Sequence, residues 1–390
     1  MRPHDTRSSF RVAKRSGRHG VPSWRIANDV VEGWLTRDGG QLAPVYFKTT
    51  RGRVQPFSIA PWRASALPPK APRVLRHLRG DFFCLPFGLG DRPWHGERYP
   101  LHGETSGNRW DLVHVERTGD TTELVASMRT MAPAGTVTKR IMLKSGQTVL
   151  YCSHEIEGVS GPMCFGHHAM LRLPDRRNAG HLAFSPIRFG QVRPSDSIAP
   201  SLLERWSLKP GATFRDLHQV PLARGGYEDL TRFPARSKSD DLVLVVSRPT
   251  IALAWSTVTL PAERYLWFSL KKPKQLAATL LWYSNGGFQS PPWNGRHRPV
   301  LGIEEITALF DFGLAASANP NCLSQRGVPT TLNFRKNVKT RISYVMGVTE
   351  LPRKFHNVSK VIFGRDLVSF ISETGAIARQ AVDLSFLSKD

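Results

Sequence analysis

The chain consists mainly of short segments with the pattern of β-strands, and helical periodicity is nearly absent from it. Residues 122–130 alternate between apolar and polar side chains, as expected of a half-buried strand. The turn signal Arg-Thr-Gly-Asp at 117–120 precedes this segment and predicts a hairpin. Residues 137–143 and 148–157 flank Ser-Gly-Gln at 145–147 and predict a second hairpin.

Later candidate strands share three features: they are short, they are rich in β-branched or aromatic residues, and Gly, Pro, Asn or Ser bounds them. Residues 305–312 predict one or two helical turns. So many strands predict an all-β fold with large antiparallel sheets packed face to face. The later strands are predicted at 242–247, 250–256, 265–270, 276–283, 342–348, 359–363 and 366–371.

Composition predicts one large folded unit. The chain has 390 residues, 40% of them hydrophobic, which is ample for a sizeable core. Residues 1–26 are rich in Arg, Ser, His and Gly without an apolar period, so they predict a mobile basic tail. Residues 27–390 are predicted to form a single β-sandwich domain, because all-β sandwiches can run long as one unit.

Localisation follows from two further features. No apolar run is long enough to span a bilayer, and the N-terminus does not resemble a secretory signal. The four cysteines form no C-x-x-C pair, which suits a reducing compartment and predicts buried free thiols. The expectation is a cytoplasmic protein without membrane association, either a monomer or a homodimer.

The net charge of +23 indicates attraction to anions. The basic residues are spread along the chain, and the sequence has no K/R-rich block, zinc-finger spacing or RNA-recognition aromatic motif. We therefore expect no specific nucleic-acid binding. The expected partner is a small-molecule carbohydrate, anionic in some cases, such as a sugar phosphate or uronate. A polyanion binder is kept as an alternative.

Residues suited to proton transfer occur in widely separated blocks. The first block, Arg-Gly-Asp at 79–81 followed by Leu-Pro-Phe-Gly at 85–88, leads to Leu-His-Gly at 101–103. Gly-His-His follows at 166–168, and Leu-Gly-Ile-Glu lies at 301–304. Together they supply imidazoles and a carboxylate, which can move protons on a neutral polar substrate.

The order of these blocks resembles the aldose 1-epimerase (galactose mutarotase-like) superfamily, particularly its hexose-phosphate epimerase-like branch. There an R-G-G-x-P-x-x-F-P strand leads to an H-G block, a later H-P-Y-F block carries the general acid, and an E-P block carries the base. The resemblance spans roughly Gly33 to Phe386. It implies a single β-supersandwich and a cofactor-independent sugar 1-epimerase, which opens the sugar ring by acid–base catalysis.

The resemblance implies His168 as the general acid and Glu304 as the base. Ala169 replaces the family's proline after the histidine, and Glu305 replaces the proline after the glutamate. Each block also has a simpler interpretation. A His-His pair can merely end a strand, and two adjacent glutamates can be a solvated pair at the start of a helical turn.

The resemblance also implies binding residues. His102 is expected to hydrogen bond to the sugar ring or its hydroxyls, and Arg79 to hold hydroxyls or phosphate oxygens. Asp229 is expected to accept hydrogen bonds from sugar hydroxyls, and Asn108 belongs to a family-like strand entry. Asp81 replaces the family's second glycine and is expected to pair with Arg79.

The sequence predicts different positions for two tryptophans. Trp110 is predicted to lie in the core, whereas Trp293 and Asn294 are predicted to line the pocket.

Three classes of function stay open. The alternatives to an epimerase are a non-catalytic carbohydrate-binding protein on the same fold and a polyanion binder. The first two classes differ in whether His168 and Glu304 face one pocket across a sugar-sized gap.

Overall fold

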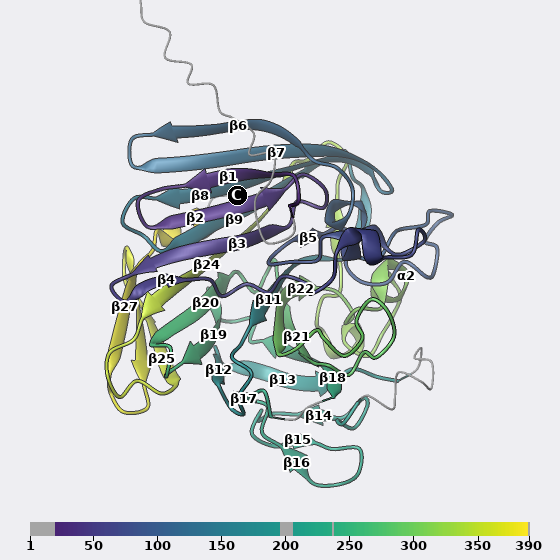
Figure 1. Cartoon of the computed structure of the whole chain (residues 1–390). Coiled ribbons are helices and arrows are strands. Elements are labelled where there is room, and N and C mark those ends of the chain that lie inside the picture. Colours follow the sequence, from purple (N-terminus) through teal and green to yellow (C-terminus); the bar gives the residue numbers. More distant parts are fainter. Residues whose placement is uncertain (1–19, 196–205, 236–237, 389–390) are drawn as a thin grey trace, which may run out of the picture.

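Antiparallel β-sheets make up most of the molecule (Figure 1). The computed structural model describes residues 20–195, 206–235 and 238–388. Among these residues the two largest sheets have seven and nine strands, and the named strands pair antiparallel throughout. This architecture confirms the all-β prediction.

The seven-stranded sheet carries the predicted acid and base blocks on two neighbouring strands near one edge. Its order is β14 (Thr213–Phe214), β13 (Ile187–Val192), β18 (Ser239–Ser247), β21 (Ala278–Asn285), β22 (Val300–Thr307), β11 (Phe165–Arg172) and β5 (Phe83–Cys84).

The nine-stranded sheet contains both predicted hairpins, β6–β7 and β8–β9, with pairings that confirm the sequence-based assignment. Its order is β17 (Arg232–Phe233), β12 (Gly180–Phe184), β19 (Ala254–Leu260), β20 (Tyr265–Lys271), β24 (Thr340–Glu350), β9 (Val149–Glu157), β8 (Ala134–Lys144), β7 (Thr121–Met131) and β6 (Asp111–Thr118).

Among the described residues, the first sheet along the chain has four strands and the last has three. The first contains β1 (Ser23–Ala27), β2 (Val31–Thr36), β3 (Leu42–Thr49) and β4 (Gly52–Val54). The second contains β25 (Val358–Phe363), β26 (Leu367–Ser372) and β27 (Ile377–Ala381). Two-stranded ribbons join β10 (Gly161–Met163) to β23 (Leu332–Phe334), and β15 (Val220–Pro221) to β16 (Tyr227–Glu228).

Two sequence-based boundaries need correction. Strand β1 begins at Ser23, so regular structure starts before the predicted boundary at residue 27, and residues 1–19 lie outside the described ranges. The helical turns predicted at 305–312 are wrong, because 305–307 complete the buried strand β22. The helix of this region, α2 (Gly313–Ala318), starts only after that strand has ended.

The other helical segments among the described residues are single 3₁₀ turns, four of them in connections and one after the last strand. They are η1 (Ala64–Ala66), η2 (Arg73–Arg76), η3 (Glu104–Ser106), η4 (Ser324–Arg326) and η5 (Leu384–Leu387).

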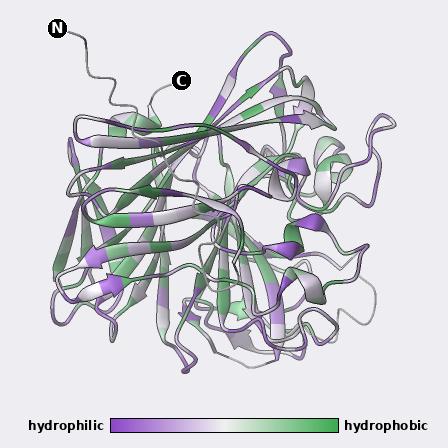
Figure 2. Ribbon diagram, turned by 45° about the horizontal axis from the view of Figure 1, so that its top comes forward, coloured by the Kyte–Doolittle hydropathy of each residue, from purple (hydrophilic) through white to green (hydrophobic). Residues whose placement is uncertain are grey.

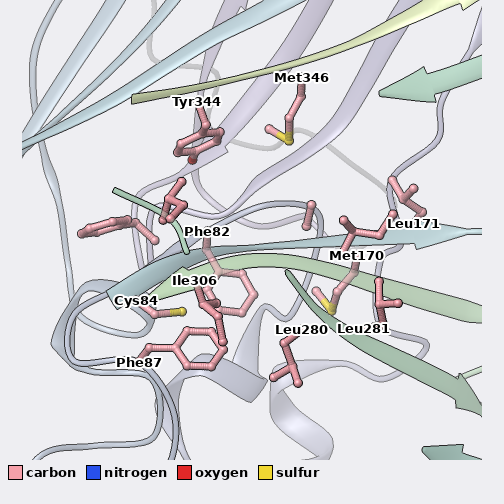
Figure 3. Close-up of a cluster of buried hydrophobic side chains, with 14 of the residues drawn as sticks. Phe82, Cys84, Phe87, Met170, Leu171, Leu280, Leu281, Ile306, Tyr344 and Met346 are labelled. Atoms are coloured by element: carbon pink, nitrogen blue, oxygen red, sulfur yellow. The ribbon is translucent and has the colours of Figure 1, made fainter. Parts of the chain in front are cut away.

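The two large sheets enclose a core of apolar side chains, part of which Figure 3 shows, and Figure 2 shows the hydrophobic residues along the strands. The core also contains polar cross-links. Glu305 on β22 forms an ion pair with Lys271 on β20, and both side chains are fully buried. Glu305 also accepts hydrogen bonds from Thr279 Oγ1 at 2.6 Å and Ser256 Oγ at 2.8 Å. These contacts satisfy a buried carboxylate that would otherwise be costly.

A second apolar cluster lies on the other face of the nine-stranded sheet. The rings of Phe268 on β20 and Phe370 on β26 lie 5.1 Å apart, and Tyr151 on β9 contacts Phe386 at 5.3 Å. The C-terminal sheet therefore covers a surface that would otherwise be exposed and apolar.

Trp110 belongs to the main core and is fully buried, as predicted.

Three of the four cysteines are buried, as predicted. Cys84, Cys152 and Cys164 are buried, whereas Cys322 is only partly buried, and none of the four forms a disulfide. Within residues 20–195, 206–235 and 238–388, no helix has the length and apolar character needed to cross a membrane.

The buried ion pair gives a stability prediction. Glu305→Gln leaves the Lys271 ammonium without its counter-charge in the core, so the free energy of unfolding should fall by about 3–5 kcal/mol. Urea denaturation monitored by circular dichroism measures the change. The double variant Lys271→Met, Glu305→Leu should recover most of the loss, because no buried charge remains. A single variant as stable as the wild type would contradict this account of the core.

Candidate active site

The pairing of β11 with β22 places two His–Glu pairs on opposite faces of the seven-stranded sheet. His167 lies opposite Glu305, and His168 lies opposite Glu304. Successive side chains of a strand point to opposite faces, so each pair occupies one face. Glu305 contacts Lys271 of the nine-stranded sheet, which assigns its pair to the core. His168 and Glu304 consequently share the outer face.

The predicted acid and base are in direct contact. His168 Nε2 lies 3.2 Å from Glu304 Oε1, and the two residues are 4% and 2% exposed. The His168 ring stacks on Phe82 with centroids 4.7 Å apart, and its backbone N–H donates to the Phe82 carbonyl at 2.9 Å. Its Nδ1 has no partner among the described residues. Stacking and backbone pairing together hold the imidazole with Nε2 beside the carboxylate.

A cavity of about 160 Å³ opens above this pair on the outer face. Its polar lining groups are His102, His168, Glu304 and Asp311, and the rest of its wall is apolar. The aromatic wall includes Trp282 and Trp293, the latter as predicted. Pockets for drug-sized ligands usually measure about 300–1,000 Å³, so this cavity suits a smaller molecule.

His102 enters the cavity from a loop with unusual backbone geometry. Its φ is +59°, and Gly103 follows at +73°, where an added Cβ would lie 2.0 Å from the Leu85 carbonyl oxygen. The Gly88 N–H donates to His102 Nδ1 at 3.3 Å, so Nε2 carries the ring proton and can donate. The His102 ring lies edge-on to His168 at 5.2 Å. Burial lowers the pKa of His102 to about 4, which keeps it neutral.

Burial also sets the electrostatics of the central pair. It raises the pKa of Glu304 well above its ordinary value, and the nearby Asp311 carboxylate raises it further. It lowers the pKa of His168 well below its ordinary value, with a smaller contribution from His102. The low-dielectric setting disfavours two separated charges, so the pair is best described as sharing a proton across the 3.2 Å contact.

Three contributors to the site were missed by the sequence analysis. Asp311 lines the cavity and forms an ion pair with Arg193, whose guanidinium lies 4.0 Å from the Phe312 ring centroid. Neither residue belongs to a recognisable motif, so the sequence carried no signal for them. Trp282 lies in a strand that was predicted, and its alternation with the buried Leu281 could have indicated a side chain on the cavity face.

Arg79 does not reach the cavity. Its backbone N–H donates to Gln41 Oε1 at 2.9 Å, and its Nε donates to the His77 carbonyl at 2.9 Å. These bonds hold it in a separate hollow. The expected Asp81–Arg79 pair is also wrong. Asp81 instead contacts His167 Nδ1 at 2.7 Å and accepts from Tyr344 Oη at 2.7 Å, inside the core.

Two further predicted binding residues lie outside the cavity lining. Asn108 Oδ1 accepts from an Arg73 guanidinium nitrogen at 2.8 Å. Asp229 accepts from the Thr231 backbone N–H at 2.9 Å and lies 3.2 Å from His218 Nδ1. Both side chains stabilise local connections. Within the part of the chain that is described, no group of three His, Cys, Asp or Glu side chains is arranged to hold a metal ion.

The fold is identified by comparing the structure with solved structures, since comparisons of the sequence find no match. No family model and no curated protein sequence matches the chain. A candidate aldose 1-epimerase from Escherichia coli K12 superposes with a TM-score of 0.56 at 14% identity, covering 84% of this chain and 99% of that one. The GalM/aldose epimerase homologue from C. elegans gives 0.54 at 13% identity, covering 85% and 99%.

A galactose mutarotase-like protein from Clostridium acetobutylicum gives a TM-score of 0.53 at 13% identity, covering 84% of this chain and 95% of that one. These neighbours define the class: a β-sandwich of the aldose 1-epimerase type. The chain has the galactose mutarotase-like fold, as its sequence blocks implied.

The pKa values of Glu304 and Glu305 are shifted in opposite directions, which predicts how the stability of the protein depends on pH. Because the pKa of Glu304 is raised in the folded protein, the folded state binds more protons above pH 4.5, and stability falls as pH rises. Glu304→Gln removes this term, so its Tm relative to the wild type should increase with pH. Differential scanning calorimetry between about pH 4 and pH 9 measures the trend.

Glu305→Gln is the matched control. The ion pair with Lys271 lowers the pKa of Glu305 against its burial, so this carboxylate stabilises the fold above its ordinary pKa and loses that effect in acid. Its replacement should therefore lower Tm at neutral pH, the opposite of Glu304→Gln. A pH-independent Tm difference for Glu304→Gln would contradict the proposed burial effect.

Proposed function

We propose that this protein is a cofactor-independent sugar 1-epimerase, which interconverts the anomers of an aldose or sugar phosphate. The observation that carries the proposal is the contact between His168 and Glu304 on the wall of a small cavity. The two residues come from different strands, and the sequence motifs imply the same two residues independently of this contact. The galactose mutarotase-like fold supports the same class of reaction.

Anomer exchange requires one proton to leave the C1 hydroxyl and one to reach the ring oxygen. The proton that the pair shares passes from His168 to the ring oxygen as the C1–O5 bond breaks and C1=O forms, and Glu304 accepts the C1 hydroxyl proton, which restores the shared proton. The aldehyde then rotates, and the reverse transfers close the ring on its other face. The raised pKa of Glu304 makes it a stronger base than an exposed carboxylate.

The close contact of the pair suits this reaction. The structure has no sugar-sized gap between His168 and Glu304, because their side chains lie 3.2 Å apart. The two reacting oxygens of the sugar are attached to the same carbon, C1, and are therefore also close together. A donor and an acceptor that lie side by side match this geometry. The neutral His102 is suited to donating from Nε2 to a further sugar oxygen.

The same contact favours one alternative, a carbohydrate-binding protein without turnover. Both groups are almost fully buried, and each satisfies the other, which is also how a structural pair would lie. The cavity would still offer aromatic walls and a few polar groups to a sugar. Kinetics distinguish the two functions, because only an epimerase accelerates anomer exchange.

The proposed roles predict a specific kinetic pattern. His168→Asn and Glu304→Gln should each lower the anomer-exchange rate by about 10²–10⁴, because each removes one proton-transfer group. Sugar affinity should stay largely intact, whereas His102→Asn should weaken binding. Exchange is measured by NMR over a panel of aldoses and hexose phosphates, with affinity measured in parallel by calorimetry.

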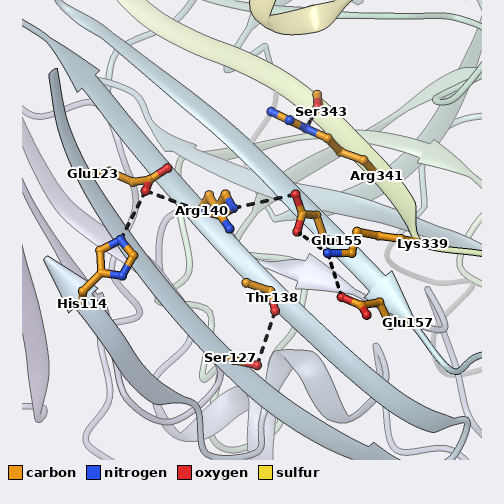
Figure 4. A network of polar contacts seen from close by, with 10 residues as sticks. All are labelled: His114, Glu123, Ser127, Thr138, Arg140, Glu155, Glu157, Lys339, Arg341 and Ser343. Carbon is orange, nitrogen blue, oxygen red and sulfur yellow. Dashed lines mark hydrogen bonds and ion pairs between the residues drawn. The ribbon is translucent and has the colours of Figure 1, made fainter. Parts of the chain in front are cut away.

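A matched control pair exists on the surface. His114 on β6 lies 3.2 Å from Glu123 on β7, within the polar network of Figure 4. This pair has the same atom types and separation as the candidate site, but it lies near the edge of the other sheet. His114→Asn and Glu123→Gln should leave exchange unchanged. A wild-type protein that binds a sugar but never accelerates exchange would establish the binding alternative.

A further inference from the structure

A second, larger recess lies at one end of strands β11, β21 and β22. It consists of two adjoining hollows of about 710 and 430 Å³, which share Arg172, Arg296 and Arg298 in their walls. We call the two hollows together the arginine groove. The candidate active-site cavity has a different lining and measures about 160 Å³. The arginine groove is therefore a separate site with room for a longer molecule.

The arginine groove is strongly cationic. Arg172, Arg296 and Lys238 are exposed, and they have no ion-pair partner among the described residues. The acidic side chain in the lining is Asp175, which lies 3.7 Å from Arg298 in a solvent-exposed pair. Asp175 therefore offsets one of the four positive side chains of the lining, which are Arg172, Lys238, Arg296 and Arg298. Several positive groups therefore face the recess with little neutralisation.

We propose that the arginine groove binds an acidic oligosaccharide through carboxylates spaced along the chain. A guanidinium presents a planar fork of donors that matches a carboxylate, and three such forks suit a ligand with repeated charges. Gln289 and Asn294 add amide groups that can hydrogen bond to hydroxyls. The proposal rests on the charge and shape of the groove and is independent of anomer exchange.

The aromatic residues of the groove favour a glycan over a nucleic acid. Single-stranded nucleic acids bind on exposed aromatic faces where the bases stack. In the groove Phe57 and Tyr265 are buried, and the ring of Tyr46 is covered by the Arg53 guanidinium at 4.6 Å. The described lining therefore lacks a free stacking platform, whereas hydroxyls and carboxylates find suitable partners.

One buried group of the groove also lacks a partner. His297 is 3% exposed and lines the smaller hollow; its Nδ1 lies 2.9 Å from Ser284 Oγ, while Nε2 has no hydrogen-bond partner among the described residues. Buried polar groups are normally satisfied. This nitrogen is itself buried, with its ring packed against Trp282 and Trp293, so it belongs to the wall of the groove and is not open to a ligand.

The test is calorimetric titration with trigalacturonate, a linear trimer of galacturonic acid, at low and high salt. Maltotriose serves as the neutral ligand of equal length. The wild type should bind trigalacturonate saturably, with an affinity that falls as salt rises, and should not bind maltotriose in the groove. Arg172→Gln and Arg296→Gln should each weaken binding by about tenfold or more, because each removes a charge-assisted hydrogen bond.

Arg365→Gln is the charge-matched control, since its side chain is 98% exposed outside the groove, and it should bind as the wild type does. Thermal unfolding of all variants checks that these surface changes leave the fold intact. The proposal is overturned if the wild type shows no saturable binding, or if Arg365→Gln weakens binding as much as the groove variants. A single-stranded oligonucleotide that binds in the groove in place of trigalacturonate would also overturn it.

Discussion

The register between β11 and β22 is the constraint on which the candidate site depends. Each strand carries two adjacent polar residues, and a shift by one residue would exchange their faces. The inner pair prevents this, because His167 is bound to Asp81, and Glu305 to Lys271, in the core. Moving Glu305 outward would leave a buried ammonium unpaired, at a cost of several kcal/mol. The ionic core thereby determines where the outer pair lies.

The sequence predicted those features that depend on regular alternation. Both hairpins of the nine-stranded sheet lie where turn residues separate alternating segments, and the cross-strand pairing follows. No strand was predicted around His168 or Glu304, which lie on β11 and β22, so only the order of the sequence motifs indicated that the two residues would converge. His102 also reached the cavity, because its following glycine permits the backbone approach.

The predictions that failed depend on connections rather than on periodicity. Arg79 is followed by Gly80, whose φ of +53° redirects the chain, and no pattern of side chains encodes that turn. The family resemblance implied Asp229, but its partner Thr231 lies only two residues away, so a local turn satisfies its carboxylate. The false helix at 305–312 arose because paired glutamates resemble a helix start. Glu305 instead lies in a buried strand, where it pairs with Lys271, and this partner is distant in sequence.

The connection between β21 and β22, residues 286–299, forms a common wall between two recesses. Trp293 faces the small cavity, while Arg296 and Arg298 face the groove. Asp240 anchors this wall, since it accepts from the Phe288 backbone N–H at 2.9 Å and the Trp282 indole at 3.1 Å. Loops tolerate insertion better than strands do. A change in the length of this one connection during evolution would therefore reshape both recesses together, so their ligand preferences are expected to diverge jointly among descendants of this chain.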